Sequence, residues 1–566
     1  MTARREALLV VTACLVLFLT GARDVPFYTR GEPREGLVVR EMRQTGTWLV
    51  PSRPDGELAR KPPLFYWLAA SATALLPDDR ELAMRLPSAL LGTGAVLATW
   101  ATARLVVGAT AGLPAALLLA TSFEWTRAAS SARVDMALTA GLTLLLAAWT
   151  ALLVQPRRGL LALAMLGATV ATLAKGPVGL VLPGLAVTAL VALRRDPSLL
   201  RRLGVIPVLG IAAAAAALWY AAAFAQHGAA FIDVVARENW QRFVDTDEAD
   251  TGHSHGLFYL PLMGLIGLLP WTALLPLAVA RTRALAATFL ATWGVVVLAF
   301  FSLADSKRSV YLLPMFPALA VLILAGSGTT DGGDRRVRAT RLLSALYVPA
   351  LALVALVVIV LSLGIDAVAL LQPWLDERDA IGAAAVVDAV RAVGPLMALL
   401  SLATLAMLPS IASARRRGDW HRLILLVAGV WIAWTASFNG LVHPAIAATR
   451  SLRAFMQQVD RLVAPTETLY AFFPPDPGLR YYAPRPLAAL STSDPDATRP
   501  LLVWQDEWRR WRDAAGRTLD PIAVSDAREG RRGSLVLVML PPGRPVLAPE
   551  VPAAPVPDVP ALTDGD

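Results

Sequence analysis

The sequence predicts a mainly α-helical protein that crosses a membrane many times and carries a small α/β domain outside it. Hydrophobic residues make up 56% of the 566 residues, charged residues make up 17%, and the mean hydropathy is +0.55. This apolar content exceeds that of ordinary soluble domains. The formal net charge of +9 does not indicate nucleic-acid binding, because the basic residues lie mostly in short loops between apolar runs. We therefore expect membrane lipids, and no nucleic acid, as partners.

Apolar runs of about twenty residues, the length that crosses a bilayer, recur along the chain. The first, at 7–20, follows Arg4 and Arg5 and is interpreted as a retained signal anchor, with cleavage near Ala22 as the alternative. Further long runs lie at about 84–105, 134–154, 177–193, 204–225, 257–280, 284–303, 309–326, 342–364, 391–409 and 422–439. Two shorter runs, at about 110–121 and 160–174, bring the expected number of spans to about thirteen.

Arginine clusters in alternate loops set the expected orientation. The positive-inside rule assigns such clusters to the cytoplasmic side. An odd number of spans then places the N-terminus in the cytoplasm and the C-terminal part in the periplasm of a bacterial inner membrane. The clusters that agree are Arg157-Arg158, Arg194-Arg195, Arg201-Arg202, Arg281 with Arg283, Arg335-Arg336-Arg338 and Arg415-Arg416-Arg417.

The chain divides into a membrane domain, an exported domain and a tail. Residues 1–439 form the expected membrane domain, with a first periplasmic loop at 21–80 and another at 226–256. Residues 440–540 form the expected periplasmic α/β domain, and 541–566, rich in Pro and Ala, an expected disordered end. Within the exported domain the pattern predicts a helix at 451–463 and strands at 468–473, 501–505 and 534–540.

The first outer loop contains two carboxylates on one side of an expected helix. We expect this helix at 33–45 on the membrane surface, because Pro33 suits a first turn and Gly46 suits a stop. At 100° per residue, Glu32 and Glu35 fall on its apolar side, where a carboxylate is a candidate for a raised pKa and general-base chemistry. The alternative is that Glu35 pairs with a nearby arginine and Glu32 only caps the helix. The charged residues expected to point away are Arg40, Glu41 and Arg43.

Two lysines beside proline also stand out. Lys61 precedes Pro62-Pro63 and an expected helix at 64–76, a position that suits a phosphate or, alternatively, snorkelling to lipid headgroups. Lys175 lies at a Gly-Pro break between two apolar runs, where an ionisable residue is costly unless it is paired or functional. We predict that Lys175 pairs with Asp135, in a functional or a purely structural pair.

More cations are expected on the same outer face, close to these carboxylates. Together with Lys61 and Lys175 they would surround an anionic group at membrane level, which indicates a lipid-linked phosphate beside a reacting sugar. They are Arg127, Arg133, Arg242, Lys307 and Arg308. His253 and His255 in the second outer loop are spaced to share a divalent metal, but a lone His-x-His also occurs without one, and both interpretations stay open.

Taken in order, several motifs resemble those of one membrane-enzyme family. They are Gly31-Glu32-x-Arg34, Arg40-Glu41-Met42, Gly46-x-Trp48-x-x-Pro51, Lys61-Pro62-Pro63-Leu64-x-x-Trp67, Arg133-x-Asp135, Lys175-Gly176-Pro177, Glu238-Asn239-x-x-Arg242-Phe243, Leu269-Pro270-Trp271, and Ser306-Lys307 through Tyr311 to Pro314. The chain resembles GT-C-fold glycosyltransferases that use polyprenyl-phosphate sugars, namely bacterial relatives of protein O-mannosyltransferases and the lipid A aminoarabinose transferases.

The resemblance implies transfer of a sugar from a polyprenyl phosphate to lipid A, another envelope glycolipid or a protein. Arg34, Tyr311 and the cations above would bind the carrier, and Lys61, Lys175, Arg242, Lys307 and Arg308 would stabilise the departing phosphate. Glu32, or alternatively Glu35, would activate an acceptor hydroxyl, and Asp135 would orient Lys175. Two positions depart from the family: Gly31 replaces its usual aspartate, and Arg60 replaces its glutamate before Lys-Pro.

Two other classes of function fit parts of the sequence. A lipid or solute transporter would explain charges within the membrane and broken helices, but the sequence has no visible inverted repeat. A membrane scaffold that presents the exported domain would leave the cations at membrane level unexplained. The glycosyltransferase hypothesis accounts for the cations at membrane level and does not require an inverted repeat.

Overall fold

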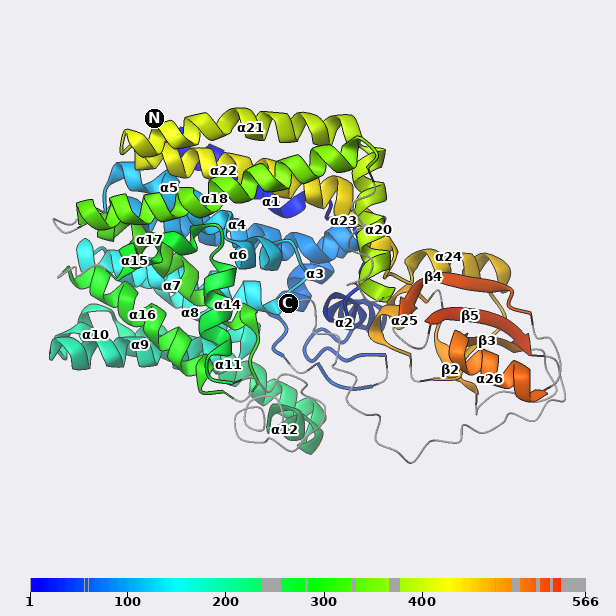
Figure 1. Cartoon of the computed structure of the whole chain (residues 1–566). Helices are drawn as coiled ribbons and strands as arrows, with labels where there is room; N and C mark the ends of the chain where they lie inside the picture. Colours follow the sequence, from blue (N-terminus) through cyan, green and yellow to red (C-terminus); the bar gives the residue numbers. More distant parts are fainter. Residues whose placement is uncertain are drawn as a thin grey trace.

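A computed structural model shows a long helical bundle joined at one end to a smaller domain that contains a sheet (Figure 1). The structure describes residues 2–54, 56–59, 61–236, 256–279, 284–304, 306–327, 332–365, 377–473, 475–483, 485–490, 499–515, 520–529 and 533–540. Three predicted site residues, Arg242, His253 and His255, lie outside these ranges, as do Arg60, most of the second outer loop and the tail at 541–566.

Eight helices among the described residues are long and apolar enough to span a membrane. They are α4 (Arg80–Val106), α7 (Val134–Val154), α11 (Val205–His227), α16 (Leu285–Ser302), η4 (Ser309–Met315) with α17 (Phe316–Ser327), α18 (Gly332–Ser362), α21 (Gly394–Arg416), and α22 (Trp420–Ser437) with η6 (Phe438–Val442) and α23 (His443–Ala448). A further pair, α14 (Tyr259–Gly267) followed by η3 (Trp271–Leu274) and α15 (Leu275–Ala278), is bent by 103° and makes nine if it is one span.

Shorter helices occupy the other expected runs, so the number thirteen stays a prediction. They are α1 (Ala3–Leu19), η1 (Ala109–Ala111) with α5 (Gly112–Ala120), α8 (Arg158–Lys175) and α9 (Val178–Arg194). The break between α8 and α9 has a local cause. Gly176 adopts a φ of 71°, which glycine tolerates, and Pro177 then begins the next helix.

Close packing of α7 against α8 brings their outer ends together. A Cβ on Gly141 would lie 2.5 Å from the Ala171 nitrogen, and one on Gly167 would lie 2.6 Å from the Leu145 nitrogen. The two backbones therefore approach each other as only small residues permit. Because the helices are antiparallel, Asp135 in the first turn of α7 meets Lys175, the last residue of α8.

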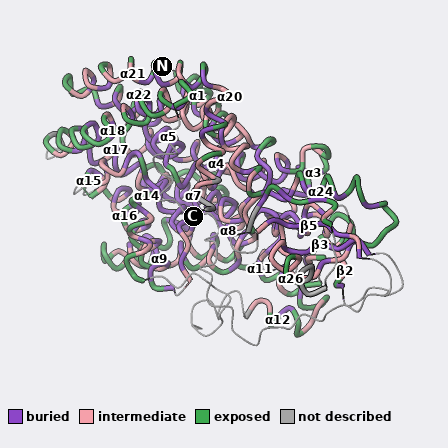
Figure 2. Tube along the Cα trace, turned by 45° about the vertical axis from the view of Figure 1, so that its right-hand side comes forward, coloured by how far each residue is buried: buried purple, intermediate pink, exposed green. Residues whose placement is uncertain are grey.

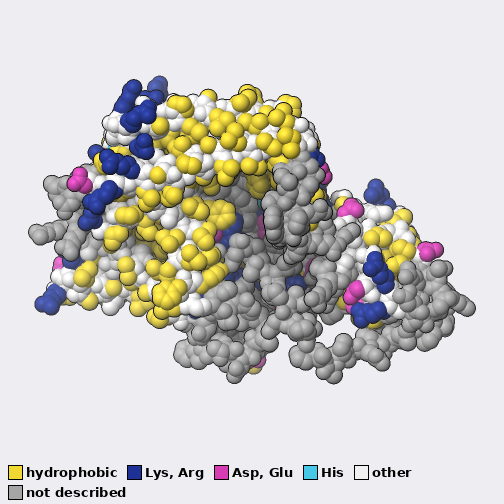
Figure 3. Space-filling model, viewed as in Figure 1, with side chains coloured by type: hydrophobic (Ala, Val, Ile, Leu, Met, Phe, Trp, Pro, Cys, Tyr) yellow, Lys and Arg dark blue, Asp and Glu magenta, His cyan; other side chains and the backbone are white. Residues whose placement is uncertain are grey.

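The surface of the bundle agrees with a membrane protein. Buried residues concentrate in its interior, for example in α5 and α7, while α18 and α21 expose one face (Figure 2). Hydrophobic side chains cover the side of the bundle, and arginine side chains gather at the end away from the smaller domain (Figure 3). The positive-inside rule would place this end in the cytoplasm, and that orientation stays a prediction.

Two short helices lie between the bundle and the smaller domain (Figure 1). The first, α2 (Gly31–Thr45), matches the expected helix and ends at Gly46, which has a φ of 73°. The second, α3 (Leu64–Leu75), begins after the two prolines as expected. The remaining helices of the membrane part are α6 (Phe123–Ala129), α10 (Ser198–Arg202), α12 (Ala229–Ala236) and α20 (Glu377–Ala392).

The C-terminal domain contains a five-stranded mixed sheet in the order β2-β1-β3-β5-β4. Its elements are α24 (Arg453–Leu462), β1 (Leu469–Ala471), α25 (Pro477–Tyr482), β2 (Leu487–Ala489), β3 (Arg499–Trp504), α26 (Gln505–Ala515), β4 (Ala523–Glu529) and β5 (Gly533–Leu540). Strand β1 is parallel to β2 and β3, whereas β5 is antiparallel to β3 and β4. The expected helix and three strands are confirmed, except that Gln505 begins a helix. The sequence prediction missed β2, which is very short, and β4, which is strongly charged.

Candidate active site

Glu32 is held in a buried ion pair with Arg85. Arg85 donates from Nε to Oε1 and from Nη2 to Oε2, each at 2.8 Å, and the Ala132 N–H donates to Oε1 at 2.9 Å. Nη1 of Arg85 also donates to the carbonyls of Ala22 and Val25, at 2.9 and 2.7 Å. Glu32 is only 8% exposed and Arg85 only 3%. This pair fixes the first loop and α2 to α4.

The environment of Glu32 corrects the expectation of a raised pKa. Burial alone would raise its pKa, but the charge and hydrogen bonds of Arg85 and the N–H of Ala132 hold it below its ordinary value. Glu32 therefore remains ionised and is a weak proton acceptor. Its helix-cap alternative also fails, because its partners are on α4 and beside α7 rather than on its own helix.

Glu35 lies one turn further along α2 and binds a different set of groups. Tyr66 donates to Oε2 at 2.7 Å, while Lys61 Nζ and Arg34 Nη2 lie 3.4 and 3.5 Å from Oε1. Burial opposes ionisation, but Lys61, Arg34 and Tyr66 together lower the pKa of Glu35 to about 2. The predicted apolar location is confirmed and the predicted raised pKa is wrong. The arginine-pairing alternative is partly right, since Arg34 is one of the partners.

The predicted pair of Asp135 and Lys175 is formed. Lys175 Nζ also lies 4.3 Å from the centre of the Tyr311 ring, which belongs to η4. Lys61 and Arg133 contribute further attractive interactions with the Asp135 carboxylate. The Lys61–Glu35 and Lys175–Asp135 pairs are therefore parts of one electrostatic network at the outer end of α7 and α8.

Arg127 joins α6 to η4. It donates to both oxygens of Glu124, at 3.1 and 2.8 Å, and to Ser309 Oγ at 2.9 Å. Ser309 in turn donates to Glu124 Oε1 at 3.2 Å. Lys307, two residues earlier, is 6% exposed and has no ion-pair partner within the described ranges, while Arg308 is half-buried. Arg127 thus has a structural role that the sequence prediction did not include.

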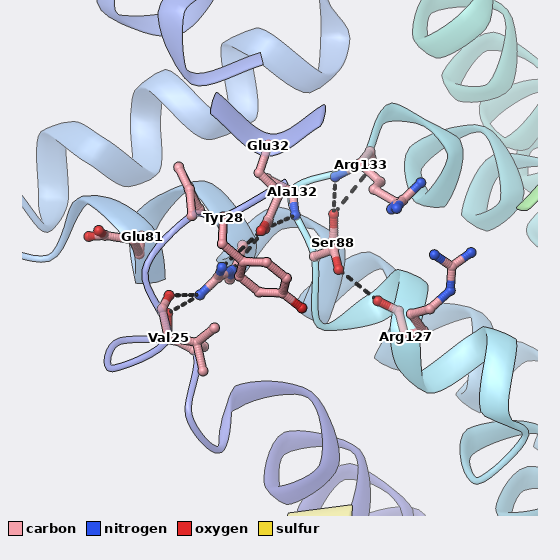
Figure 4. Close-up of polar contacts among 12 residues, drawn as sticks. Val25, Tyr28, Glu32, Glu81, Ser88, Arg127, Ala132 and Arg133 are labelled. Atoms are coloured by element: carbon pink, nitrogen blue, oxygen red, sulfur yellow. Dashed lines mark hydrogen bonds and ion pairs between the residues drawn. The ribbon is translucent and has the colours of Figure 1, made fainter. Parts of the chain in front are cut away.

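Arg133 lies between these groups. Its backbone N–H donates to Ser88 Oγ at 3.2 Å, and its Nε is buried without a hydrogen-bond partner among the described residues. The Arg127 and Arg133 side chains both turn away from Glu32 (Figure 4). A buried donor of this kind usually has a partner, so an anionic ligand would satisfy it.

Several site residues were missed from the sequence. Arg85 lies in the expected span at 84–105, and a single charge at the start of an apolar run could have indicated a paired or functional residue. Glu124 precedes Arg127 by three residues, a spacing at which helical side chains pair. Tyr66 and Ser309 carried no signal of their own. Within the described residues no group of three or more metal-ligating side chains occurs, so the metal prediction rests on the two histidines alone.

Comparison with known proteins finds similar sequences over part of the chain and a similar fold over nearly all of it. A family model for dolichyl-phosphate-mannose-protein mannosyltransferases matches residues 60–221. An undecaprenyl phosphate-α-4-amino-4-deoxy-L-arabinose arabinosyl transferase of Yersinia pestis is 29% identical over 375 residues, 62% of this chain and 65% of that protein. An uncharacterized protein of Aquifex aeolicus is 25% identical over 327 residues, 56% of this chain and 63% of that protein. The chain thus matches slightly less than two thirds of either relative.

The structural similarity extends over nearly the whole molecule. The crystal structure of ArnT from Cupriavidus metallidurans bound to undecaprenyl phosphate has a TM-score of 0.73 with 21% sequence identity, covering 95% of this chain and 98% of that one. The apo structure of the same protein gives a TM-score of 0.71. The predicted resemblance is confirmed: this multi-pass membrane protein has the GT-C fold and is similar to the glycosyltransferases that use polyprenyl-phosphate sugars.

Proposed function

We propose that the protein is an integral-membrane glycosyltransferase of a bacterial inner membrane. It transfers a sugar from a polyprenyl-phosphate donor, such as undecaprenyl phosphate, to a lipid A-like molecule, another envelope glycolipid or a protein on the periplasmic side. The support comes from the cationic network at the outer end of the bundle, together with the similarity to such enzymes in sequence and fold.

The use of lysine is the observation that carries this proposal. Of the 52 basic residues only three are lysines, namely Lys61, Lys175 and Lys307. Lys61 contacts Glu35 and Lys175 contacts Asp135, while Lys307 precedes η4, whose Tyr311 ring lies over Lys175. An ammonium is a compact charge with donors that rotate, so it can exchange a carboxylate partner for a phosphate oxygen. A chain that otherwise uses arginine has its lysines where the donor phosphate would bind.

The reaction requires stabilisation of a departing phosphate. The acceptor oxygen attacks the anomeric carbon, the bond from that carbon to the phosphate oxygen breaks, and the polyprenyl phosphate keeps the electron pair. The lysines, Arg133 and Arg34 would neutralise the charge that develops on the phosphate. Asp135 would orient Lys175, and Tyr311 would limit its movement.

Glu35, rather than Glu32, would remove the proton from a hydroxyl acceptor. Glu32 is bound on both oxygens by Arg85. Lys61 is the charge that most lowers the pKa of Glu35, so binding of Lys61 to the donor phosphate would raise that pKa toward a useful value. A phosphate acceptor is already ionised and needs no base.

A donor-cleavage assay tests the proposal. Purified protein is incubated with a radiolabelled polyprenyl-phosphate sugar, and release of free polyprenyl phosphate is expected only when an acceptor is present. Lys61→Ala should lower kcat at least about 100-fold, as loss of a charge-stabilising donor does, and exposed Arg461→Ala should not. Glu35→Gln should slow transfer to hydroxyl acceptors only.

The same assay separates the alternatives. Movement of the labelled lipid across vesicles without bond cleavage would favour a transporter and reject the enzyme. Near-normal turnover in Lys61→Ala would remove that lysine from the mechanism.

A further inference from the structure

A groove lies between α2, the connection from α3 to α4 and the C-terminal domain. Its volume is about 410 Å³, and its floor is formed by Val39, Met84 and Tyr481, which are 2%, 1% and 6% exposed. A second cleft of about 790 Å³ continues from it and shares Arg40, Gln44, Arg80 and Tyr481. The groove therefore has an apolar floor and an open, polar end.

The charged residues that line the groove are all positive. They are Arg40, Arg43 and Arg80, with no Asp or Glu among the lining residues. Arg40 donates to the Tyr481 carbonyl and Arg43 to the Thr73 carbonyl, each at 3.3 Å, and no carboxylate in the described part of the chain pairs with any of the three. Each guanidinium has five N–H donors, so these contacts leave donors available in a planar arrangement that matches phosphate oxygens.

The adjoining cleft offsets this charge only in part. It contains four carboxylates, of which two are already bound: Glu81 accepts from Tyr482 at 2.8 Å and pairs with Arg453 at 3.3 Å, and Asp460 pairs with Arg485 at 3.2 Å. The other two, Glu41 and Asp78, line only this cleft and not the groove. Glu41 interacts electrostatically with Arg40, but no carboxylate of the described residues forms an ion pair with the three groove arginines, of which Arg43 and Arg80 are exposed.

The position of the groove indicates a lipid rather than a soluble anion. Arg80 and Met84 belong to the first turns of α4, a candidate membrane span, so they lie at the depth of lipid headgroups. Leu75, at the end of α3 just before the connection that lines the groove, is 80% exposed. The apolar floor beside arginines at this level matches an amphiphile with a phosphate next to its hydrocarbon part.

We propose that this groove binds the phosphate-bearing headgroup of an anionic membrane lipid. The site is separate from the proposed donor site, because Glu35, Lys61 and Lys175 are not among the residues that line the groove. Lipid binding in the groove does not depend on the transfer reaction. If the proposed glycosyltransferase activity is disproved, the lipid site can still be tested, and the reverse also holds.

The test measures lipid binding by the full-length protein in detergent. The probe is fluorescent phosphatidylglycerol, and the comparison lipid is diacylglycerol with the same chains, which lacks the phosphate. The double variant Arg40→Gln/Arg80→Gln is expected to bind phosphatidylglycerol at least about tenfold more weakly, because two charge-assisted contacts are lost. The charge-matched control is Arg461→Gln/Arg509→Gln, which changes two exposed arginines of the C-terminal domain and should bind like the wild type.

Four results would overturn the inference. Equal binding of phosphatidylglycerol by the wild type and the Arg40→Gln/Arg80→Gln variant would exclude the groove as the lipid-binding site. Equal affinity for diacylglycerol and phosphatidylglycerol would exclude phosphate recognition, and displacement of the lipid by equimolar inorganic phosphate would exclude a lipid site. Binding of polyprenyl phosphate, measured in parallel, should be unchanged in the double variant; a matching loss would mean a single shared site.

Discussion

At the scale of single residues, the two carboxylates of α2 differ because their partners differ. Both were expected on the apolar side of the helix, and both are buried. Glu32 faces Arg85, a buried guanidinium that also holds two backbone carbonyls, so removal of either partner would leave an uncompensated buried charge. Glu35 faces the more accessible side chains of Lys61 and Arg34. The pair with Arg85 is structural, whereas the proposed mechanism requires the pair with Lys61 to exchange.

The lowered pKa of Glu35 predicts a pH-dependent contribution to stability. The pKa is about 2 in the folded protein, below the ordinary value of 4.5. The stabilisation is therefore complete above about pH 4.5 and is lost as the pH falls toward 2. Glu35→Gln should lower the unfolding temperature at pH 7, and its difference from the wild type should shrink below pH 4.5. Thermal unfolding of the detergent-solubilised protein at several pH values measures this.

Tyr66→Phe provides the control for that experiment. It removes one hydrogen bond that lowers the pKa of Glu35 but keeps the Lys61 and Arg34 charges. The stabilisation by Glu35 should then be smaller at pH 7, and its loss, which begins near pH 4.5 in both proteins, should be complete at a higher pH than in the wild type. A difference between Glu35→Gln and the wild type that stays constant from pH 7 to 3 would contradict the assignment.

At the scale of elements, the C-terminal domain packs directly on the loop that carries the site. Tyr482 accepts from the Phe27 N–H at 2.7 Å and donates to Glu81 at 2.8 Å. The Phe27 ring lies 5.1 Å from that of Tyr481 and 5.0 Å from the Arg85 guanidinium. The domain therefore covers the same loop and arginine that hold Glu32.

Gly36 makes this packing possible and gives a prediction at the element scale. A Cβ at Gly36 would lie 2.5 Å from the Tyr481 ring, whereas a Cβ at Gly31 on the same helix would have no neighbour within 4 Å. Gly36→Ala should displace α25 from α2 and cost about 1–3 kcal/mol, as overpacking does, with faster proteolytic release of the C-terminal domain. Gly31→Ala is the matched control and should behave like the wild type. Equal proteolysis of the two variants would show that the contact is not tight.

At the scale of the whole molecule, the distribution of charge predicts one orientation in the membrane. Cys14 is the only cysteine and is buried, so single cysteines can be introduced without background labelling. Exposed Glu467 lies in the C-terminal domain and exposed Arg417 lies between α21 and α22. In spheroplasts, a membrane-impermeant maleimide should label Glu467→Cys directly and Arg417→Cys only after permeabilisation. The reverse pattern would invert the topology and place the proposed site in the cytoplasm.

The sequence by itself determined the long apolar helices, the end of α2 at Thr45 and the pair of Asp135 with Lys175. These depend on local properties: the lengths of apolar runs, the turn preferences of Pro33, Gly46 and Gly176, and the cost of an unpaired charge in a membrane. Only the tertiary structure decided that Glu32 is bound by Arg85, that Glu35 has a lowered pKa, and that three arginines line a groove. The reason is that pKa values and binding surfaces depend on side chains from distant segments, whose approach is decided by packing and not by local pattern.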